Sequence, residues 1–373
     1  MALQITALIP AFNEASSIAA TIEALLVQER IPDRIVVIPN GCSDNTARIA
    51  RSYAETDSRV IVLELPPLEH KKSEALNTGW NLFGRTADLV ICLDADTILP
   101  PNAVQDWEQE FVTASAKGLM LGGSSSKFTM LGGDFWTRLQ RSEFAKWTDS
   151  ALLRGWTTVL AGTGCAINGA ALRQVVDETN RPGPWSYRSQ VEDFELTFQL
   201  RLRGWKCQVS PTVRAYTDSM KTLKALWGQR MKWQVGTVED LLGIGVNRLT
   251  LLDWWQQIVG LTMALIRVLW VILLVALGIT DQLHFSVIWW VALPLIFAAG
   301  EFILSFRIPH ADRMDHIYAT MIVPAEIFAW VRSAWFVKAW LEVLSAKLFK
   351  TEPKDRWLLQ YAAEATTSKQ EEE

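Results

Sequence analysis

The chain has 373 residues, which is enough for about two domains of ordinary size. Half of its residues are apolar and 20% are charged, against about 45–50% and about 25% in soluble globular proteins. This balance excludes a disordered chain and a small disulfide-stabilised scaffold. The formal charge of −4 also argues against a dedicated nucleic-acid-binding protein.

The cysteines give a second general expectation. Cys42, Cys92, Cys165 and Cys207 lie far apart in the sequence and form no C-x-x-C pair. We therefore expect free thiols in a reducing compartment rather than a zinc site or a disulfide framework.

Residues 1–217 alternate between short apolar runs and helical patterns. The runs at 5–9, 35–38, 60–63 and 89–93 are rich in Ile, Val and Leu, as is typical of strands covered on both faces. The segments between them carry apolar residues at helical spacing, for example Ile18, Ile22 and Leu25. The pattern predicts a doubly wound α/β domain with a mostly parallel sheet, in which ligands bind at the carboxyl ends of the strands. Met1–Thr6 lacks the pattern of an export signal, so we expect this domain in the cytoplasm.

The C-terminal part is suited to a different solvent. Residues 258–279 and 285–306 are two apolar segments of 22 residues, each with a single charge. About 20 apolar residues span a bilayer core, so both are predicted membrane spans, and two buried core helices are the alternative. Arg307 and Arg313 follow the second segment, which favours a cytoplasmic position for that loop and for the N-terminal domain. The sequence thus predicts a multi-pass protein of the cell membrane.

Three further parts of this region have separate expectations. Residues 218–255 are expected to form interfacial amphipathic helices. The segment 317–344 carries four charges, so it is expected to lie in the membrane plane, to be re-entrant or, alternatively, to span. Residues 347–373 are predicted to be a polar cytoplasmic tail. The lone charges Arg267 and Glu301 are expected to pair or to line a polar path.

Acidic residues follow one of the predicted strands. Asp94 and Asp96 come directly after the apolar run 89–93, and strand alternation directs them to the same side. Two carboxylates at the edge of a sheet suit Mg²⁺ or Mn²⁺, which bind phosphates through one or two such ligands. The alternative is an ordinary solvated or capping pair.

Two other strings carry charged side chains. Glu192 and Asp193 open a helix that has Phe194, Phe198 and Leu202 on one stripe, and acids in a first turn are also expected from the helix dipole alone. The run Gln229–Trp233 combines polar, basic and aromatic residues just before the apolar segments. On its own, this run could equally be an interfacial helix that directs its cations toward lipid headgroups.

Together with four other strings, these motifs resemble those of the family 2 glycosyltransferases, in particular the membrane-integrated branch with the cellulose, chitin and hyaluronan synthases. The matching strings occur in the family's order, at Ile9–Glu14, Asn40–Thr46, Lys72–Gly79, Asp94–Asp96, Gly162–Cys165, Glu192–Asp193 and Gln229–Trp233. The resemblance covers residues 5–236 and implies the nucleotide-sugar-binding GT-A fold, followed by interfacial and transmembrane helices.

The resemblance also implies a role for each matched residue. Asp193 would be the catalytic base with Glu192 beside it, and Asp94 and Asp96 would hold a divalent cation, Mg²⁺ or Mn²⁺. The expected donor-binding residues are Pro10, Asn13, Glu14, Asn40, Lys72, Asp94, Gln229, Arg230 and Lys232. The expected acceptor-binding residues are Gly162, Thr163, Gly164, Cys165 and Trp233.

Two positions depart from the family's pattern. Pro39 and Asn40 stand where the family usually has two acids, the first of which helps to hold the nucleoside. Lys232 stands where arginine is usual, so the charge is kept but the bidentate fork is lost. The first departure bears on the identity of the nucleotide and the second on processive synthesis.

The implied function is inverting transfer of a hexose or N-acetylhexosamine from a nucleoside-diphosphate sugar, in the first instance a UDP-sugar. The acceptor would be a hydroxyl of a membrane-proximal glycan, as in polysaccharide synthesis. Transfer of one sugar to a polyprenyl phosphate or a glycolipid is the first alternative, and an inactive membrane scaffold that binds nucleotide sugars is the second. The implied partners are the donor, a glycan or lipid-linked acceptor, the lipid bilayer and possible further copies or accessory subunits.

Overall fold

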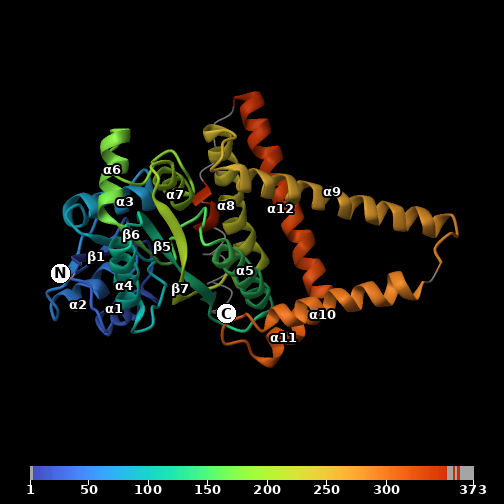
Figure 1. The fold of residues 1–373 in the computed structure, drawn as a ribbon, viewed down its shortest axis with the longest axis horizontal. Coiled ribbons are helices and arrows are strands. Elements are labelled where there is room, and N and C mark those ends of the chain that lie inside the picture. Colours follow the sequence, from blue (N-terminus) through green and yellow to red (C-terminus); the bar gives the residue numbers. More distant parts are fainter. Residues whose placement is uncertain (1–2, 285, 351–355, 358, 362–373) are drawn as a thin grey trace. The chain divides into compact units, whose positions relative to one another are not determined.

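The computed structural model describes residues 3–284, 286–350, 356–357 and 359–361 of the chain (Figure 1). The described chain divides into two compact units, which are considered separately below. The first unit contains residues 1–131 and 147–218, and the second contains residues 132–146 and 219–373. Most of the predicted polar tail, 347–373, lies outside the described residues.

The first unit is built on a seven-stranded sheet with the order β3-β2-β1-β4-β6-β5-β7. Its strands are β1 (Ile5–Ala11), β2 (Arg34–Pro39), β3 (Val60–Val62), β4 (Leu89–Cys92), β5 (Leu121–Met130), β6 (Cys165–Asn168) and β7 (Lys206–Thr217). The neighbours β3, β2, β1 and β4 are parallel, β6 is antiparallel to both β4 and β5, and β7 is parallel to β5. The predicted α/β class with a mostly parallel sheet is therefore confirmed.

Helices cover the sheet because each parallel crossover needs one. They are α1 (Ile18–Leu26), α2 (Thr46–Ala54), α3 (Lys71–Gly79), α4 (Ala103–Ala116), α6 (Gly169–Thr179) and α7 (Glu192–Leu202), and a π-helical turn, η1 (Trp80–Gly84), extends α3. A buried core cluster joins strand residues such as Leu8 and Val90 to Leu76, Trp80 and Leu200 of the helices. This core fixes α3 and α7 to the sheet and thereby positions the residues at their N-terminal ends.

The second unit is helical. It consists of the first part of α5 (Phe135–Arg154), followed by α8 (Leu223–Ile244), α9 (Leu251–Ile279), η2 (Ile288–Ala292), α10 (Leu293–Ser305), α11 (Arg313–Thr320) and α12 (Ile322–Phe349). Its core contains Leu139, Leu226, Val235, Trp335 and Ala339, which come from α5, α8 and α12.

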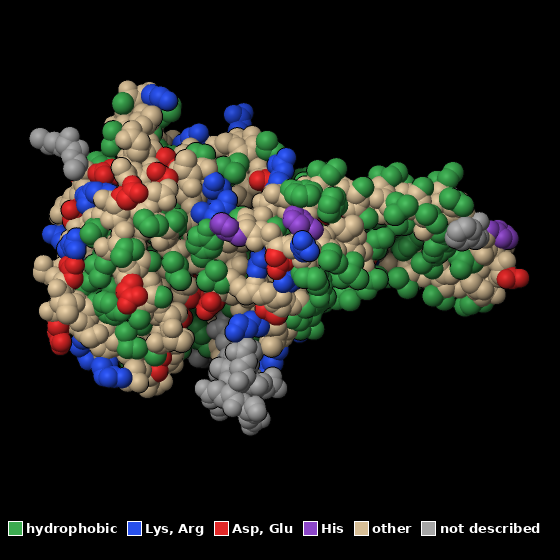
Figure 2. All heavy atoms as spheres, turned by 90° about the horizontal axis from the view of Figure 1, so that it is seen from below, with side chains coloured by type: hydrophobic (Ala, Val, Ile, Leu, Met, Phe, Trp, Pro, Cys, Tyr) green, Lys and Arg blue, Asp and Glu red, His purple; other side chains and the backbone are tan. Residues whose placement is uncertain are grey.

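The apolar C-terminal segments are helical and expose their apolar side chains. In the part of the chain that the structure describes, α9 alone is long and apolar enough to cross a membrane as a single helix, and only 6% of its most apolar window is buried. On the face seen in Figure 2, the part of the second unit that contains α9 and α10 carries many apolar side chains and few charged ones. The pair α11 and α12 passes the same test together but is bent by 71°, and the second predicted span is the shorter apolar helix Trp290–Ser305.

The expected pairing of Arg267 with Glu301 is wrong. Arg267 lies 3.8 Å from Glu326 and donates a hydrogen bond to Ser333 at 3.3 Å, both on α12. Glu301 forms an ion pair with Lys146 of α5. Arg267 therefore has its contacts on α12 and Glu301 has its contact on α5.

Candidate active site

The edge of the sheet where β1 and β4 end is the expected ligand position. Strand β1 pairs with β2 on one side and with β4 on the other. The order of the strands reverses between β1 and β4, and in open α/β sheets ligands bind at the carboxyl ends of the two strands at such a point. Pro10 is the second-last residue of β1, and Asp94 follows β4 by two residues. Because Cys165 begins the antiparallel β6 directly opposite Cys92, the turn that contains Gly162 and Gly164 reaches the same edge.

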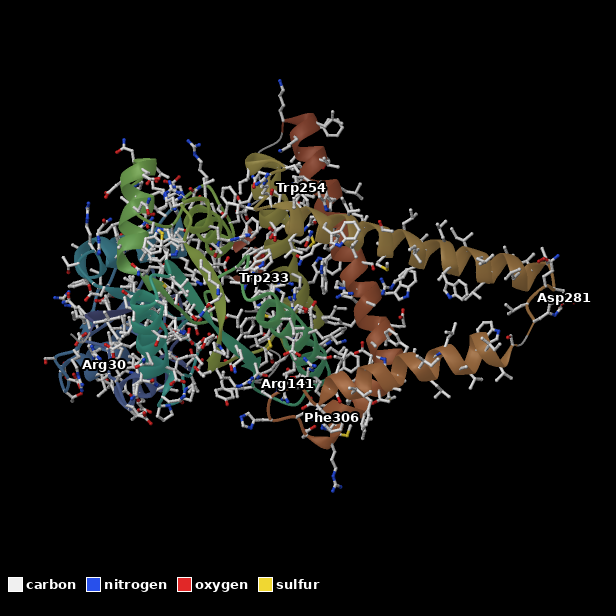
Figure 3. All side chains as sticks on the ribbon, viewed as in Figure 1. Arg30, Arg141, Trp233, Trp254, Asp281 and Phe306 are labelled. Atoms are coloured by element: carbon white, nitrogen blue, oxygen red, sulfur yellow. The ribbon has the colours of Figure 1, made fainter. Side chains whose placement is uncertain are left out.

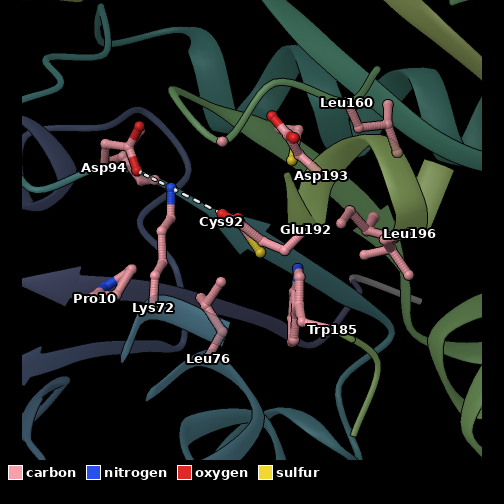
Figure 4. Close-up of a pocket in the computed structure, with 14 residues that line it drawn as sticks. Pro10, Lys72, Leu76, Cys92, Asp94, Leu160, Trp185, Glu192, Asp193 and Leu196 are labelled. Atoms are coloured by element: carbon pink, nitrogen blue, oxygen red, sulfur yellow. Dashed lines mark hydrogen bonds and ion pairs between the residues drawn. The ribbon is translucent and has the colours of Figure 1, made fainter. Parts of the chain in front are cut away.

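A pocket at this edge brings together four charged residues from three of the sequence motifs (Figure 4). Lys72, from the start of α3, extends between Asp94 and Glu192, with its Nζ 2.5 Å from Asp94 Oδ1 and 3.4 Å from Glu192 Oε1. Asp193 also lines the pocket, next to Glu192 at the N-terminus of α7. Lys72 and Glu192 are 120 positions apart in the sequence, yet they belong to one ionic cluster.

The cluster holds one half-buried positive charge among carboxylates. Burial opposes the charge on Lys72, but the neighbouring carboxylates, led by Asp94 and Glu192, outweigh it and raise the pKa of Lys72 well above its usual value. Lys72 is thus a fixed cation. The Asp193 carboxylate accepts a hydrogen bond from the backbone N–H of Phe194 at 2.8 Å and lies in the first turn of α7.

The Gly162–Cys165 turn lies against this cation. A Cβ atom on Gly162 would lie only 2.7 Å from Lys72 Nζ and 3.8 Å from both Asp94 carboxylate oxygens. Gly162 and Cys165 line the pocket, whereas Thr163 and Gly164 form the turn between them. A hydrogen bond with Cys92 and burial raise the pKa of the Cys165 thiol well above its usual value, so this thiol is protonated at neutral pH.

Asp96 is not among the residues that line this pocket, but the charges of Asp94 and Asp218 act on its carboxylate. Its carboxylate accepts hydrogen bonds from Thr217 Oγ1 at 3.1 Å and from Thr97 Oγ1 at 3.3 Å. Burial, followed by the negative charges of Asp94 and Asp218, raises the pKa of Asp96 to about 7. Oxygen donors that repel one another in this way fit a hard divalent cation, whose charge would relieve the repulsion.

Within the described residues, no three His, Cys, Asp or Glu side chains are close enough to form a complete metal site. Magnesium usually takes only one or two protein carboxylates and completes its shell with water and substrate phosphates. The residues present fit that mode of binding, with Asp94 and Asp96 as the protein ligands.

The predicted nucleoside-binding loops are joined to each other. The Asn13 side chain accepts a hydrogen bond from Ser43 N–H at 2.8 Å, and Asp44 accepts one from Ala15 N–H at 3.0 Å. Thr46 Oγ1 accepts a hydrogen bond from Glu14 N–H at 2.7 Å. Asn40 is buried beside them at the end of β2. These contacts fix the backbone after β1 and β2.

Several residues of the pocket were not predicted from the sequence. Besides the charged cluster, the pocket is lined largely by apolar side chains, which are those of Leu76, Cys92, Leu93, Leu160, Ile167, Trp185 and Leu196. Trp185 is 3% exposed, and both its backbone N–H and its C=O bond to the side chain of Asn77. No local signal marks Trp185, because its contacts depend on a partner 108 residues away. Asp218, beside Asp96, was missed for the same reason.

The other predicted site residues, Gln229, Arg230, Lys232 and Trp233, all lie on α8 in the second unit (Figure 3). The Arg230 side chain is buried, lies 2.8 Å from Glu143 of α5 and packs over the rings of Phe144 and Trp233. The Lys232 ammonium lies 3.2 Å from the centre of the Trp357 ring. Their predicted roles toward a donor or acceptor stay predictions.

Comparison of the sequence with known proteins identifies a matching family. Residues 3–236 match the profile of the family described as "Glycosyltransferase like family 2". The chain is 28% identical over 244 residues to the poly-β-1,6-N-acetyl-D-glucosamine synthase of Staphylococcus aureus, which covers 64% of this chain and 55% of that protein. It is 26% identical over 261 residues to the synthase of the same name from Staphylococcus epidermidis, with 68% and 57% covered. The chain thus spans somewhat more than half the length of these relatives.

The fold also matches a solved structure over most of its length. A mannosyltransferase from Pyrobaculum calidifontis, determined with GDP-mannose and Mn²⁺, superposes with a TM-score of 0.54. The match covers 92% of this chain and 88% of that one at 15% sequence identity. At this identity the match establishes the shared fold alone.

Proposed function

Because the chain belongs to glycosyltransferase family 2, we propose that it transfers a sugar from a nucleoside diphosphate to an acceptor hydroxyl, with inversion at the anomeric carbon. One observation carries this proposal. Lys72, Asp94, Glu192 and Asp193 come from distant motifs and line one pocket at the carboxyl edge of the sheet. A fixed cation beside a carboxylate that can take a proton is the pair of groups that this reaction requires.

The chemistry is a single displacement. The acceptor hydroxyl gives its proton to the Asp193 carboxylate while its oxygen forms a bond to the anomeric carbon. The bond from that carbon to the diphosphate oxygen breaks, and the nucleoside diphosphate leaves with the electron pair. Lys72 lies close enough to Asp94 and Glu192 to hold both carboxylates in place, and its charge favours the negative charge that develops on the leaving group.

Asp94 and Asp96 are the residues that would hold a divalent cation. When bound, the cation would supply Lewis-acid stabilisation to the diphosphate. In the structure Asp94 accepts a hydrogen bond from Lys72, and Asp96 accepts one from Thr217. The Mn²⁺ in the mannosyltransferase of similar fold is consistent with this assignment.

The proposed donor is UDP-N-acetylglucosamine, and the proposed acceptor is a glycan at the membrane. The names of the staphylococcal relatives support the sugar. The exposed apolar surface of α9 supports a position at a bilayer. The first unit would lie in the cytoplasm, because Arg307 and Arg313 favour that side for the loop after the second apolar segment. The family resemblance implies that the α8 residues Gln229, Arg230, Lys232 and Trp233 contact donor or acceptor.

Transfer of a single sugar to a lipid-linked acceptor is the second candidate. Lys232, in place of the family's arginine, favours this candidate over long-chain synthesis, because it keeps the charge but not the bidentate fork.

The test uses the purified full chain in lipid nanodiscs. Labelled UDP-N-acetylglucosamine, UDP-glucose and GDP-mannose are supplied with and without Mn²⁺, and the products are separated into polymer, lipid-linked sugar and free sugar. We expect transfer from UDP-N-acetylglucosamine that depends on the cation. Polymer supports the first candidate and a lipid-linked product the second.

Asp193→Asn provides the control for the base. We expect it to lower turnover by about 10²–10⁴-fold while nucleotide affinity is kept, because only the proton acceptor is lost. The matched variant Asp177→Asn changes an exposed aspartate on α6 and is expected to leave turnover unchanged. Absence of transfer from all donors, or full activity of Asp193→Asn, would contradict the proposed function.

A further inference from the structure

The helices that carry the ionic cluster do not pack mainly against each other. α3, which carries Lys72, packs on β1, β2 and η1, whereas α7, which carries Glu192 and Asp193, packs on β5, β7 and α6. Both helices are held on the same sheet, which sets their approximate separation, and a direct connection between them would fix the distance of 3.4 Å between Lys72 and Glu192 more closely.

The loop 180–191 makes this connection. At its start, Arg181 Nη1 donates to both carboxylate oxygens of Glu195 on α7 at 3.0 Å. In its middle, the loop is attached to α3, and at its end it runs directly into Glu192. The loop thus contacts both helices that carry the charged residues.

Two hydrogen bonds of this attachment come from one side chain of α3. Asn77 donates from Nδ2 to the carbonyl of Trp185 at 2.7 Å, and its Oδ1 accepts from the N–H of Trp185 at 3.0 Å. Asn77 is 1% exposed, so water does not compete for these bonds. Gly183 passes so close that a Cβ there would lie 2.2 Å from Asn77 Oδ1.

Two weaker contacts extend the same helical stripe. Asn81 donates to the carbonyl of Pro182 at 2.8 Å, and the ring of His70 stacks on that of Tyr187 with centroids 4.5 Å apart and planes 13° apart. His70, Asn77 and Asn81 are spaced by seven and four residues, so they lie on one face of the helix.

We propose that Asn77 is a positioning residue for the reaction: by holding the backbone of Trp185, it sets the separation between Lys72 and the Glu192–Asp193 pair. This inference rests on the proposed function, and it concerns a residue that touches neither donor nor acceptor. Its side chain acts through the loop, and a shift of about 1 Å in a catalytic group is enough to cost up to about 10²-fold in rate.

The experiment compares Asn77→Ala with Asn168→Ala in the full chain in nanodiscs. Asn168 is the N-cap of α6, where its side chain accepts hydrogen bonds from Ala170 and Ala171, so its loss is an equally local loss of two bonds to the backbone. Both variants are expected to lower the thermal midpoint. Asn77→Ala alone is expected to lower kcat by about ten- to a hundredfold with the KM for the donor changed less than about threefold.

A second readout does not depend on turnover. In wild type, Lys72 is held between carboxylates, so we expect it to react slowly with acetic anhydride, as measured by mass spectrometry of the Lys72 peptide. Asn77→Ala should increase this rate severalfold because Glu192 moves away, whereas Asn168→Ala should leave it unchanged. A wild type that transfers no sugar refutes the proposed function, and the labelling of Lys72 then still tests the positioning.

Gly183→Ala disturbs the same contact from the loop side. We expect it to act like Asn77→Ala, and the double variant to be no worse than the poorer single variant, because both changes remove one contact. If Gly183→Ala does not fold, the two asparagine variants carry the test. The inference is overturned if Asn77→Ala keeps wild-type kcat and Lys72 labelling, or if the losses in the double variant are additive.

Discussion

At the scale of single residues, Gly162 is the position where the backbone comes closest to the functional cation. Alanine there would place a methyl group 2.7 Å from Lys72 Nζ, well inside van der Waals contact. The lysine side chain is flexible, so it would move rather than unfold the turn, and its contact with Asp94 would be lost. A side chain at position 162 would therefore displace the Lys72 ammonium.

We therefore expect Gly162→Ala to lower turnover by about tenfold or more with a small change in thermal midpoint, since only the position of a charged group changes. Steady-state kinetics and a thermal melt in nanodiscs measure the two effects. Gly243→Ala is the control, because a Cβ at that helical position meets nothing within 4 Å. A variant Gly162→Ala with normal turnover would show that the contact between Lys72 and Asp94 is dispensable.

The predicted charged site residues that the structure brings into one pocket are those with local motifs. Asp94 follows a buried strand and Asp193 opens a helix, and the pocket contains both. Asn77 belonged to a recognised string, yet its contact with Trp185 could not be predicted, because it depends on how a loop 108 residues away folds back. Motifs identify side chains with chemistry, whereas the residues that position them depend on tertiary packing.

At the scale of secondary structure, apolar runs predicted the four parallel strands to within a few residues. The long strand β5, with the sequence LGGSSSKFTM, was not predicted, because it contains three serines and two glycines in place of an apolar run. Its serines are nevertheless fully buried. Ser124, for example, donates a hydrogen bond to Glu110 of α4 at 2.6 Å, so a polar partner takes the place of apolar packing.

The ion pair between Glu143 and Arg230 connects α5 to α8 and gives a prediction at this scale. Both side chains are largely buried, with 21% and 9% exposed, and Arg230 also packs over Phe144 and Trp233. We expect Glu143→Leu to destabilise the chain by about 3–5 kcal/mol, because it leaves a buried guanidinium without its charge partner.

The double variant Glu143→Leu with Arg230→Met separates the pair from its surroundings. It is expected to recover most of the lost stability, because apolar residues of similar volume replace a buried ion pair at little cost. Thermal melts of the single and double variants in nanodiscs measure the difference. A double variant as unstable as Glu143→Leu alone would indicate that the two side chains do not act as a pair.

At the scale of the whole molecule, composition separates a part suited to water from a part suited to lipid. α9 has 29 residues and a mean hydropathy of 2.6 over its most apolar window, with 6% of that window buried. At about 1.5 Å per residue its length exceeds the roughly 30 Å of a bilayer core. In water its exposed leucines would cost about 25 cal/mol per Å² of apolar surface, so this surface requires lipid or another apolar partner.

Insertion of α9 can be tested with matched lysine substitutions. Leu269 and Leu273 lie in the apolar part of α9 with 53% and 46% of their side chains exposed, and Leu119 and Met120 lie on the first unit with 54% and 49% exposed. The two pairs are therefore similarly exposed, and the predicted solvent around them differs. Each lysine near the centre of a membrane span costs about 2.5–3.5 kcal/mol on the insertion scale, whereas a lysine in water costs nothing comparable.

We expect Leu269→Lys with Leu273→Lys to reduce the fraction of the chain that resists alkaline carbonate extraction, and Leu119→Lys with Met120→Lys to leave that fraction unchanged. Equal behaviour of the two pairs would exclude α9 as a membrane span and would require a protein partner for its apolar surface.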